Sequence, residues 1–124
     1  MAPQAALSLE HEGPRIGSRT ALHERFSRGR TLALAVFTSP GCRLCEALEP
    51  AVRLVGSDPK VELEVFEERR DSELWRALRI PGSPYGVVVD PAGTVLAKGT
   101  FNTLLQLEGL LATAERRVHE HVHA

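Results

Sequence analysis

The sequence predicts one α/β domain in which helices cover both faces of a central mixed sheet of four to five strands. The first observation is the segment 31–38, TLALAVFT, which is apolar on both faces, as in a strand at the middle of a sheet. The second is the order strand–helix–strand that begins there, because such a unit makes parallel strands. The third is a hairpin signal around Pro91 and Gly93, which adds an antiparallel pair.

The elements follow from their patterns in order. After Gly41 apolar residues recur at helical spacing, and the segment 56–59, GSDP, ends this helix. These apolar residues are Leu44, Leu48, Val52 and Val55. Residues 61–65 alternate strictly between apolar and acidic side chains, which predicts a half-buried strand near an edge.

A second helix is predicted over 71–80, where Asp71 and Ser72 are residues that often cap a helix. The only tryptophan, Trp75, falls on its apolar face, so we expect it to pack in the core. Strands at 86–90 and 94–101 form the hairpin, and a last helix covers 104–118. Lys98 on the final strand is expected to be a solvated charge.

The chain divides into three parts. Residues 1–29 are expected to be a lead-in that is partly loop, in which alternation at 5–9 is compatible with a short strand. Residues 30–118 form the domain, and 119–124 form a tail that contains His119, His121 and His123. Alternating histidines can bind metal, but we expect this end to be solvated and frayed.

Composition excludes several classes of function. The chain has 15 Lys and Arg against 16 Asp and Glu, so it lacks the basic surplus that nucleic-acid binding requires. Residues 1–20 lack the apolar centre of an export signal, and the longest apolar run, 32–37, is too short to cross a membrane. As written, the chain is therefore expected to be a soluble, cytoplasmic monomer, and an extracytoplasmic protein if an anchor has been trimmed.

The two cysteines of the chain, Cys42 and Cys45, follow the central strand and begin the first helix. A helix N-terminus stabilises a thiolate, and Arg43 adds a nearby cation, so Cys42 is expected to attack and Cys45 to resolve. A structural disulfide is the first alternative, although closing so small a loop stabilises by about 2 kcal/mol at most. A zinc site is the second, but it needs about four ligands, so we expect no metal.

Two segments, 32–52 (LALAVFTSPGCRLCEALEPAV) and 79–99 (RIPGSPYGVVVDPAGTVLAKG), resemble the thioredoxin-like superfamily. Within it, the second segment resembles the TlpA-type and methylamine-utilisation MauD-type domains, and the resemblance covers about residues 30–116. It implies a thioredoxin fold and thiol-disulfide exchange with protein clients and a redox partner, without a cofactor. It also implies a cis-proline facing the cysteines.

Pro84 matches that proline, and Ser83 would offer its backbone to an extended client. A trans proline at a strand start is the alternative for Pro84, and Pro81 competes for the matching position.

This sequence departs from thioredoxins at several positions. Gly41 stands where tryptophan is usual, and Val36 stands where thioredoxins hold a buried acid, so we expect slow resolution by Cys45. Glu46 and Glu49 follow the cysteines but are expected to point outward, away from the apolar stripe of the helix. Two rival functions remain: a non-catalytic maturation or client-binding module, and a metal carrier that uses both cysteines and the tail.

Overall fold

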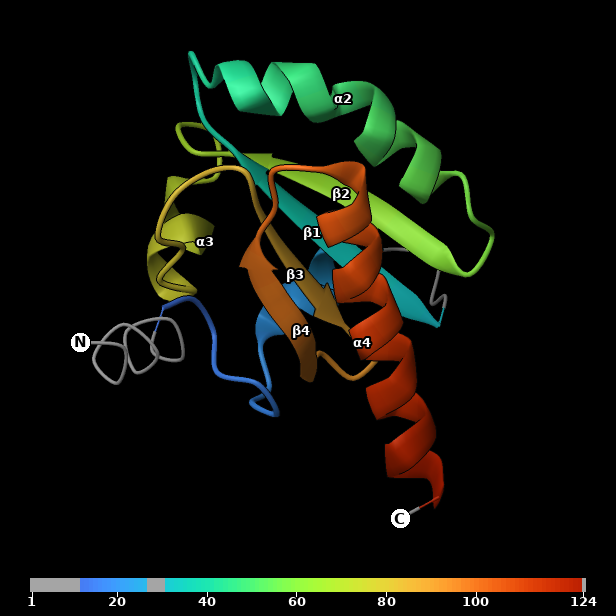
Figure 1. Ribbon diagram of the computed structural model, residues 1–124. Coiled ribbons are helices and arrows are strands. Elements are labelled where there is room, and N and C mark those ends of the chain that lie inside the picture. The colour runs from blue at the N-terminus through green and yellow to red at the C-terminus, as the bar shows by residue number, and fades with distance from the viewer. Residues whose placement is uncertain (1–11, 27–30, 124) are drawn as a thin grey trace, which may run out of the picture.

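The computed structural model describes residues 12–26 and 31–123. Its elements are η1 (Ala21–Arg25), β1 (Leu32–Thr38), α2 (Arg43–Gly56), β2 (Val61–Glu67), α3 (Ser72–Ala77), β3 (Tyr85–Val89), β4 (Val95–Thr100) and α4 (Leu104–His123). The strands form one sheet in the order β2-β1-β3-β4, in which β1 and β2 are parallel and the other pairs are antiparallel (Figure 1). The predicted mixed sheet with a central β1 is confirmed.

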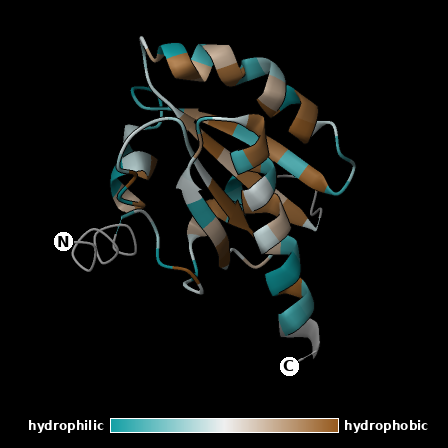
Figure 2. Ribbon diagram, viewed as in Figure 1, coloured by the Kyte–Doolittle hydropathy of each residue, from teal (hydrophilic) through white to brown (hydrophobic). Residues whose placement is uncertain are grey.

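The core has two layers because every residue of β1 from 32 to 37 is buried. Leu34 and Val36 face α2 and α4, whereas Ala35 and Phe37 face α3 and η1. Figures 1 and 2 show this arrangement: helices lie on both faces, and hydrophobic residues concentrate on the strands between them. None of the described helices is long and apolar enough to cross a membrane.

The edge strand β2 departs from the predicted alternation at two positions, Glu62 and Val65. Glu62 is buried, with 7% of its surface exposed, whereas Val65 is 39% exposed. Val65 pairs with Val36 of β1, yet it lines an open cavity between α2 and the sheet. The sequence pattern therefore predicts the strand and its edge position but not the gap beside it.

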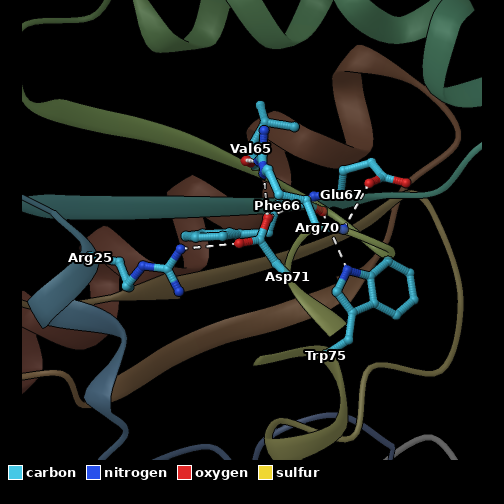
Figure 3. Close-up of polar contacts among 7 residues, drawn as sticks. All are labelled: Arg25, Val65, Phe66, Glu67, Arg70, Asp71 and Trp75. Atoms are coloured by element: carbon cyan, nitrogen blue, oxygen red, sulfur yellow. Dashed lines mark hydrogen bonds and ion pairs between the residues drawn. The ribbon is translucent and has the colours of Figure 1, made fainter. Parts of the chain in front are cut away.

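Asp71 was expected to cap α3, but its side chain makes no capping hydrogen bond. Instead, its buried carboxylate accepts hydrogen bonds from Arg25 Nη2 at 3.1 Å, Arg70 Nε at 2.9 Å and the Glu67 N–H at 3.1 Å (Figure 3). Burial raises the pKa of this carboxyl, but the hydrogen bonds from Arg70 and Arg25 outweigh it, so the pKa lies below its usual value.

The neighbourhood of Asp71 joins η1 to β2 and α3, which lie more than 35 residues later in the chain. The Arg25 guanidinium lies 5.0 Å from the centre of the Phe66 ring, and Trp75 Nε1 donates to the Phe66 carbonyl at 3.3 Å. Trp75 also contacts Phe37 edge to face. The expectation that Trp75 packs in the core is confirmed, and η1, β2 and α3 are held together at this point.

Residues 12–26, part of the expected lead-in, lie against the β3–β4 hairpin. The Gly17 N–H donates to the Val95 carbonyl at 2.8 Å, and the Thr20 N–H donates to the Gly93 carbonyl at 2.9 Å. Leu22 is fully buried. Lys98, expected to be solvated, donates to the Glu12 carbonyl at 2.7 Å, so that expectation is wrong. The strand suggested for 5–9 lies outside the described residues.

The last helix, α4, continues past its predicted end at Val118 to His123. The sequence from 110 to 123 contains neither proline nor glycine, so nothing in it stops the helix. His119 and His121 therefore belong to helical backbone, not to an irregular tail.

Candidate active site

The two cysteines lie at the turn from β1 into α2. Gly41 has a φ of +71°, a left-handed conformation that glycine adopts without a Cβ clash. Cys42 follows as the N-cap of α2 in extended conformation, and its Sγ accepts a hydrogen bond from the Cys45 N–H at 3.1 Å. Cys42 and Cys45 form a disulfide with a Cα–Cα distance of 5.2 Å.

Both cysteines are half-buried, so burial alone does not distinguish an attacking from a resolving sulfur. Their difference lies in the helix. Cys42 stands at the N-cap, where free N–H groups and the helix dipole favour a negative charge. Arg43 is exposed, and no hydrogen bond or ion pair to its side chain occurs within the described part of the chain.

The loop before β3 faces the cysteines. The Ser83–Pro84 peptide bond is cis, and Pro84 lines the same cavity as Cys42 and Cys45. Pro84 is buried and its carbonyl accepts from the Phe101 N–H at 3.4 Å, whereas Pro81 is exposed. Pro84 therefore occupies the position expected for the proline of the site.

Ser39 is a site residue that the sequence reasoning did not identify. Its hydroxyl is hydrogen-bonded to the Ser83 hydroxyl, which ties the loop before Cys42 to the loop of Pro84. The Ser39 carbonyl also accepts from the Cys42 N–H at 3.2 Å. A hydroxyl residue three positions before Cys42 was the only available signal, and it does not indicate a partner 44 residues away.

A cavity of about 460 Å³ opens behind the disulfide, between α2 and the sheet. Its walls are mainly apolar: Val36, Leu48, Val52, Leu63, Val65 and Phe101. Glu46, Glu49 and Arg53 also line it, and all three are exposed, so Glu46 and Glu49 face solvent as expected while they border the cavity. They border the cavity because the apolar stripe of α2 is buried only from Val52 onward, while Leu44 is 38% exposed.

The two metal alternatives involve the cysteines and the histidines near the C-terminus. Among the described residues, no group of three or more His, Cys, Asp or Glu side chains could hold a metal ion. Metal binding by a cysteine requires a thiolate, and both sulfurs are joined in a disulfide. The side chains of His121 and His123 lie outside the described part of the structure.

The chain is similar in sequence to methylamine utilization proteins. No family model matches the chain. It is 26% identical to the methylamine utilization protein MauD of Methylophilus methylotrophus, over 90% of this chain and 68% of that protein. It is 28% identical to MauD of Methylorubrum extorquens, over 82% of this chain and 57% of that protein. MauD of Paracoccus denitrificans is 29% identical, over 88% of this chain and 70% of that protein.

The similar solved structures are thioredoxins. The thioredoxin of Trypanosoma brucei brucei superposes with a TM-score of 0.66 at 18% identity, over 82% of this chain and 95% of that one. The reduced thioredoxin pre-protein of Schistosoma mansoni gives 0.65 at 14% identity, over 74% and 85% of the two chains. These likenesses show the thioredoxin fold, and the MauD relatives support the thioredoxin-like assignment.

Proposed function

We propose that this thioredoxin-like chain is a thiol-disulfide oxidoreductase that exchanges disulfides with protein partners, with Cys42 as the attacking and Cys45 as the resolving sulfur. One observation carries the proposal. The Cys42–Cys45 disulfide lies at the start of α2 and shares a cavity with the cis Ser83–Pro84 segment. The fold, the CxxC disulfide and the MauD relatives all support this activity.

In the reductive direction the Cys42 thiolate attacks one sulfur of a client disulfide. The Cys42–client bond forms, and the other client sulfur leaves as a thiolate. The Cys45 thiolate then attacks Cys42, so that the Cys42–Cys45 disulfide forms and the second client sulfur leaves. The client gains two electrons and the CxxC pair loses two, which a dithiol redox partner returns. The two sulfurs carry both electrons, so no cofactor enters the cycle.

Placement on the helix supports the division of roles. The Cys45 N–H already points to Cys42 Sγ at 3.1 Å, and the same contact would stabilise a Cys42 thiolate after reduction. The Ser83–Pro84 backbone would form the wall along which an extended client lies, and Ser39 would hold that wall through its hydrogen bond to Ser83. We further propose that the chain acts as a monomer.

The test is reduction of insulin by dithiothreitol, followed by turbidity, for the native chain and for Cys42→Ser and Cys45→Ser. The native chain should accelerate precipitation and both variants should lose the activity. Cys45→Ser should accumulate a client disulfide-bonded to Cys42, detectable by mass spectrometry. Trapping on Cys45 in the Cys42→Ser variant instead would reverse the roles.

A second candidate function is a non-catalytic client-binding or maturation module. The observation that favours it is the similarity to MauD proteins, whose name refers to methylamine utilization and not to general disulfide reduction. A native chain that gives no acceleration of insulin precipitation, while still folding cooperatively, would support this candidate over the oxidoreductase.

A further inference from the structure

The resolving step requires a proton acceptor for Cys45. Before Cys45 attacks Cys42, its thiol must lose a proton, because the thiolate is the attacking species. The inference that follows rests on the proposed function, because it concerns the second half of that exchange.

The central strand supplies no acceptor. Val36 is 2% exposed, and its neighbours across the sheet are Val65 and Gly86. Apart from the cysteines, the titratable side chains that line the cavity are Glu46, Glu49 and Arg53, all from α2. The residues that β1, β2, the Pro84 loop and Phe101 contribute to the wall are not ionisable: Val36, Thr38, Ser39, Leu63, Val65, Pro84 and Phe101.

The positions of the two carboxylates on α2 indicate which of them lies on the same face as Cys45. Glu49 lies four residues after Cys45, on the same face of α2, where Cβ atoms are roughly 5–6 Å apart. Glu46 lies four residues after Cys42 and is rotated by roughly 100° from Cys45. The face that carries Cys45 therefore presents Glu49 one turn further along.

Arg53 continues the same face by one more turn and donates from Nη2 to Glu49 Oε1. This bond uses one oxygen of Glu49, and no hydrogen bond or ion pair to Oε2 occurs among residues 12–26 and 31–123. A water in the cavity would find polar partners in Cys45 Sγ and Glu49 Oε2, and the cavity has room for several waters. We propose that Glu49, oriented by Arg53, accepts the proton of the Cys45 thiol through such a water.

In this step the Cys45 S–H bond breaks and the proton passes to the Glu49 carboxylate. The Cys45 thiolate attacks Cys42 Sγ, the Cys42–client bond breaks, and the client sulfur leaves with the bonding pair. The proton on Glu49 then passes to solvent or to the leaving thiolate, which restores the carboxylate for the next turnover.

The experiment follows the reduced protein mixed with the chromogenic disulfide 5,5′-dithiobis(2-nitrobenzoate). Release of the first thionitrobenzoate reports attack by Cys42, and release of the second reports resolution by Cys45. Absence of both phases would mean failure of the proposed function itself. A normal first phase isolates the inference, which concerns the second phase alone.

Glu49→Gln should slow the second phase at least about tenfold near pH 6. A well-positioned proton acceptor contributes roughly 100-fold, and we expect a smaller effect here because the Glu49 side chain is 58% exposed. The first phase should stay within about twofold. The deficit should shrink as pH rises towards about 9, where the thiol ionises without help. Glu49→Asp should restore part of the rate.

Glu46→Gln tests the other carboxylate, and Glu115→Gln, on the exposed side of α4, is the remote control that should match the native chain. Thermal melts would verify that each variant is folded. An unchanged second phase in Glu49→Gln would overturn the proposal. Equal slowing by Glu46→Gln would also overturn it, and so would a deficit that does not depend on pH, since neither singles out proton transfer to Glu49.

Discussion

Asp71 offers a quantitative test of how the domain is held together, through the change Asp71→Asn. The substitution keeps the size of the side chain and removes its charge. The carboxylate is 7% exposed, but its two arginine partners, Arg25 and Arg70, are 46% and 65% exposed, so solvent weakens both ion pairs. We assign about 0.5 kcal/mol to each ion pair and a similar amount to the weakened bond from the Glu67 N–H, about 1.5 kcal/mol altogether.

The pH dependence of this loss has a definite sign. The pKa of Asp71 in the folded protein lies below its usual value, so folding favours the ionised form. The stabilisation is complete above the pKa of the unfolded chain, about 3.9, and disappears as pH falls through the folded pKa. The native chain should therefore exceed Asp71→Asn in unfolding free energy by a constant amount from pH 5 to 7, and the gap should narrow below pH 4.

Urea unfolding, followed by the fluorescence of Trp75, the only tryptophan, measures the unfolding free energy of the native chain and of Asp71→Asn at each pH. The matched control is Glu73→Gln, which removes an exposed acid from the first turn of the same helix and should change little. A difference at pH 7 below about 0.5 kcal/mol, the spread expected of ordinary surface substitutions, would refute the reasoning. A gap that stays constant down to pH 3 would refute it equally.

Two further predictions concern single residues, Gly41 and Tyr85. Gly41→Ala should lower the unfolding free energy by about 1 kcal/mol, because alanine is strained at a φ of +71° even though no atom obstructs its Cβ. The control Gly82→Ala has the same open space but no positive φ, so its unfolding free energy should stay close to that of the native chain. Equal losses of unfolding free energy in the two variants would argue against backbone strain as the cause. Tyr85, the only tyrosine, should ionise at about pH 12 in an alkaline absorbance titration, because burial and then the charge of Glu12 raise its pKa to about 12. A midpoint near 10 would contradict that environment.

The sequence predicts most of the sheet because the buried positions of each strand and helix are occupied by apolar residues at a regular spacing. The segment of β1 is apolar on both faces since it lies between β2 and β3 with helices above and below. The CxxC motif is equally visible, because a strand, a break at Gly41 and a helical stripe surround it. Location of the site at the start of α2 needs no more information than that.

The lead-in is harder to predict because its attachment depends on backbone hydrogen bonds. Residues 12–26 join β4 through main-chain contacts such as Gly17 to Val95, and these leave no side-chain pattern. From this segment, Leu22 is fully buried in the core and Phe26 packs against it. The sequence indicates that Asp71 caps a helix. Its carboxylate instead binds Arg25, which lies 46 residues earlier and could not be identified from the local pattern.

The carboxylates that line the cavity, Glu46 and Glu49, are a further feature that the sequence pattern did not predict. An apolar stripe identifies the residues of α2 that face the sheet but not how far the helix stands from it. With Val36 and Val65 paired across β1 and β2, the inner end of the cavity is apolar, and the sheet avoids the cost of a buried charge at that position. An acid at the outer end keeps its hydration, since Glu49 is 58% exposed, and it lines the same cavity as the two cysteines. In thioredoxins the acid lies on the central strand, whereas the acid proposed here lies on α2. With this arrangement the stability of the sheet does not depend on the residue that accepts the proton of Cys45. Substitutions at Val36 should then act mainly on stability, and substitutions at Glu49 mainly on the pH dependence of resolution.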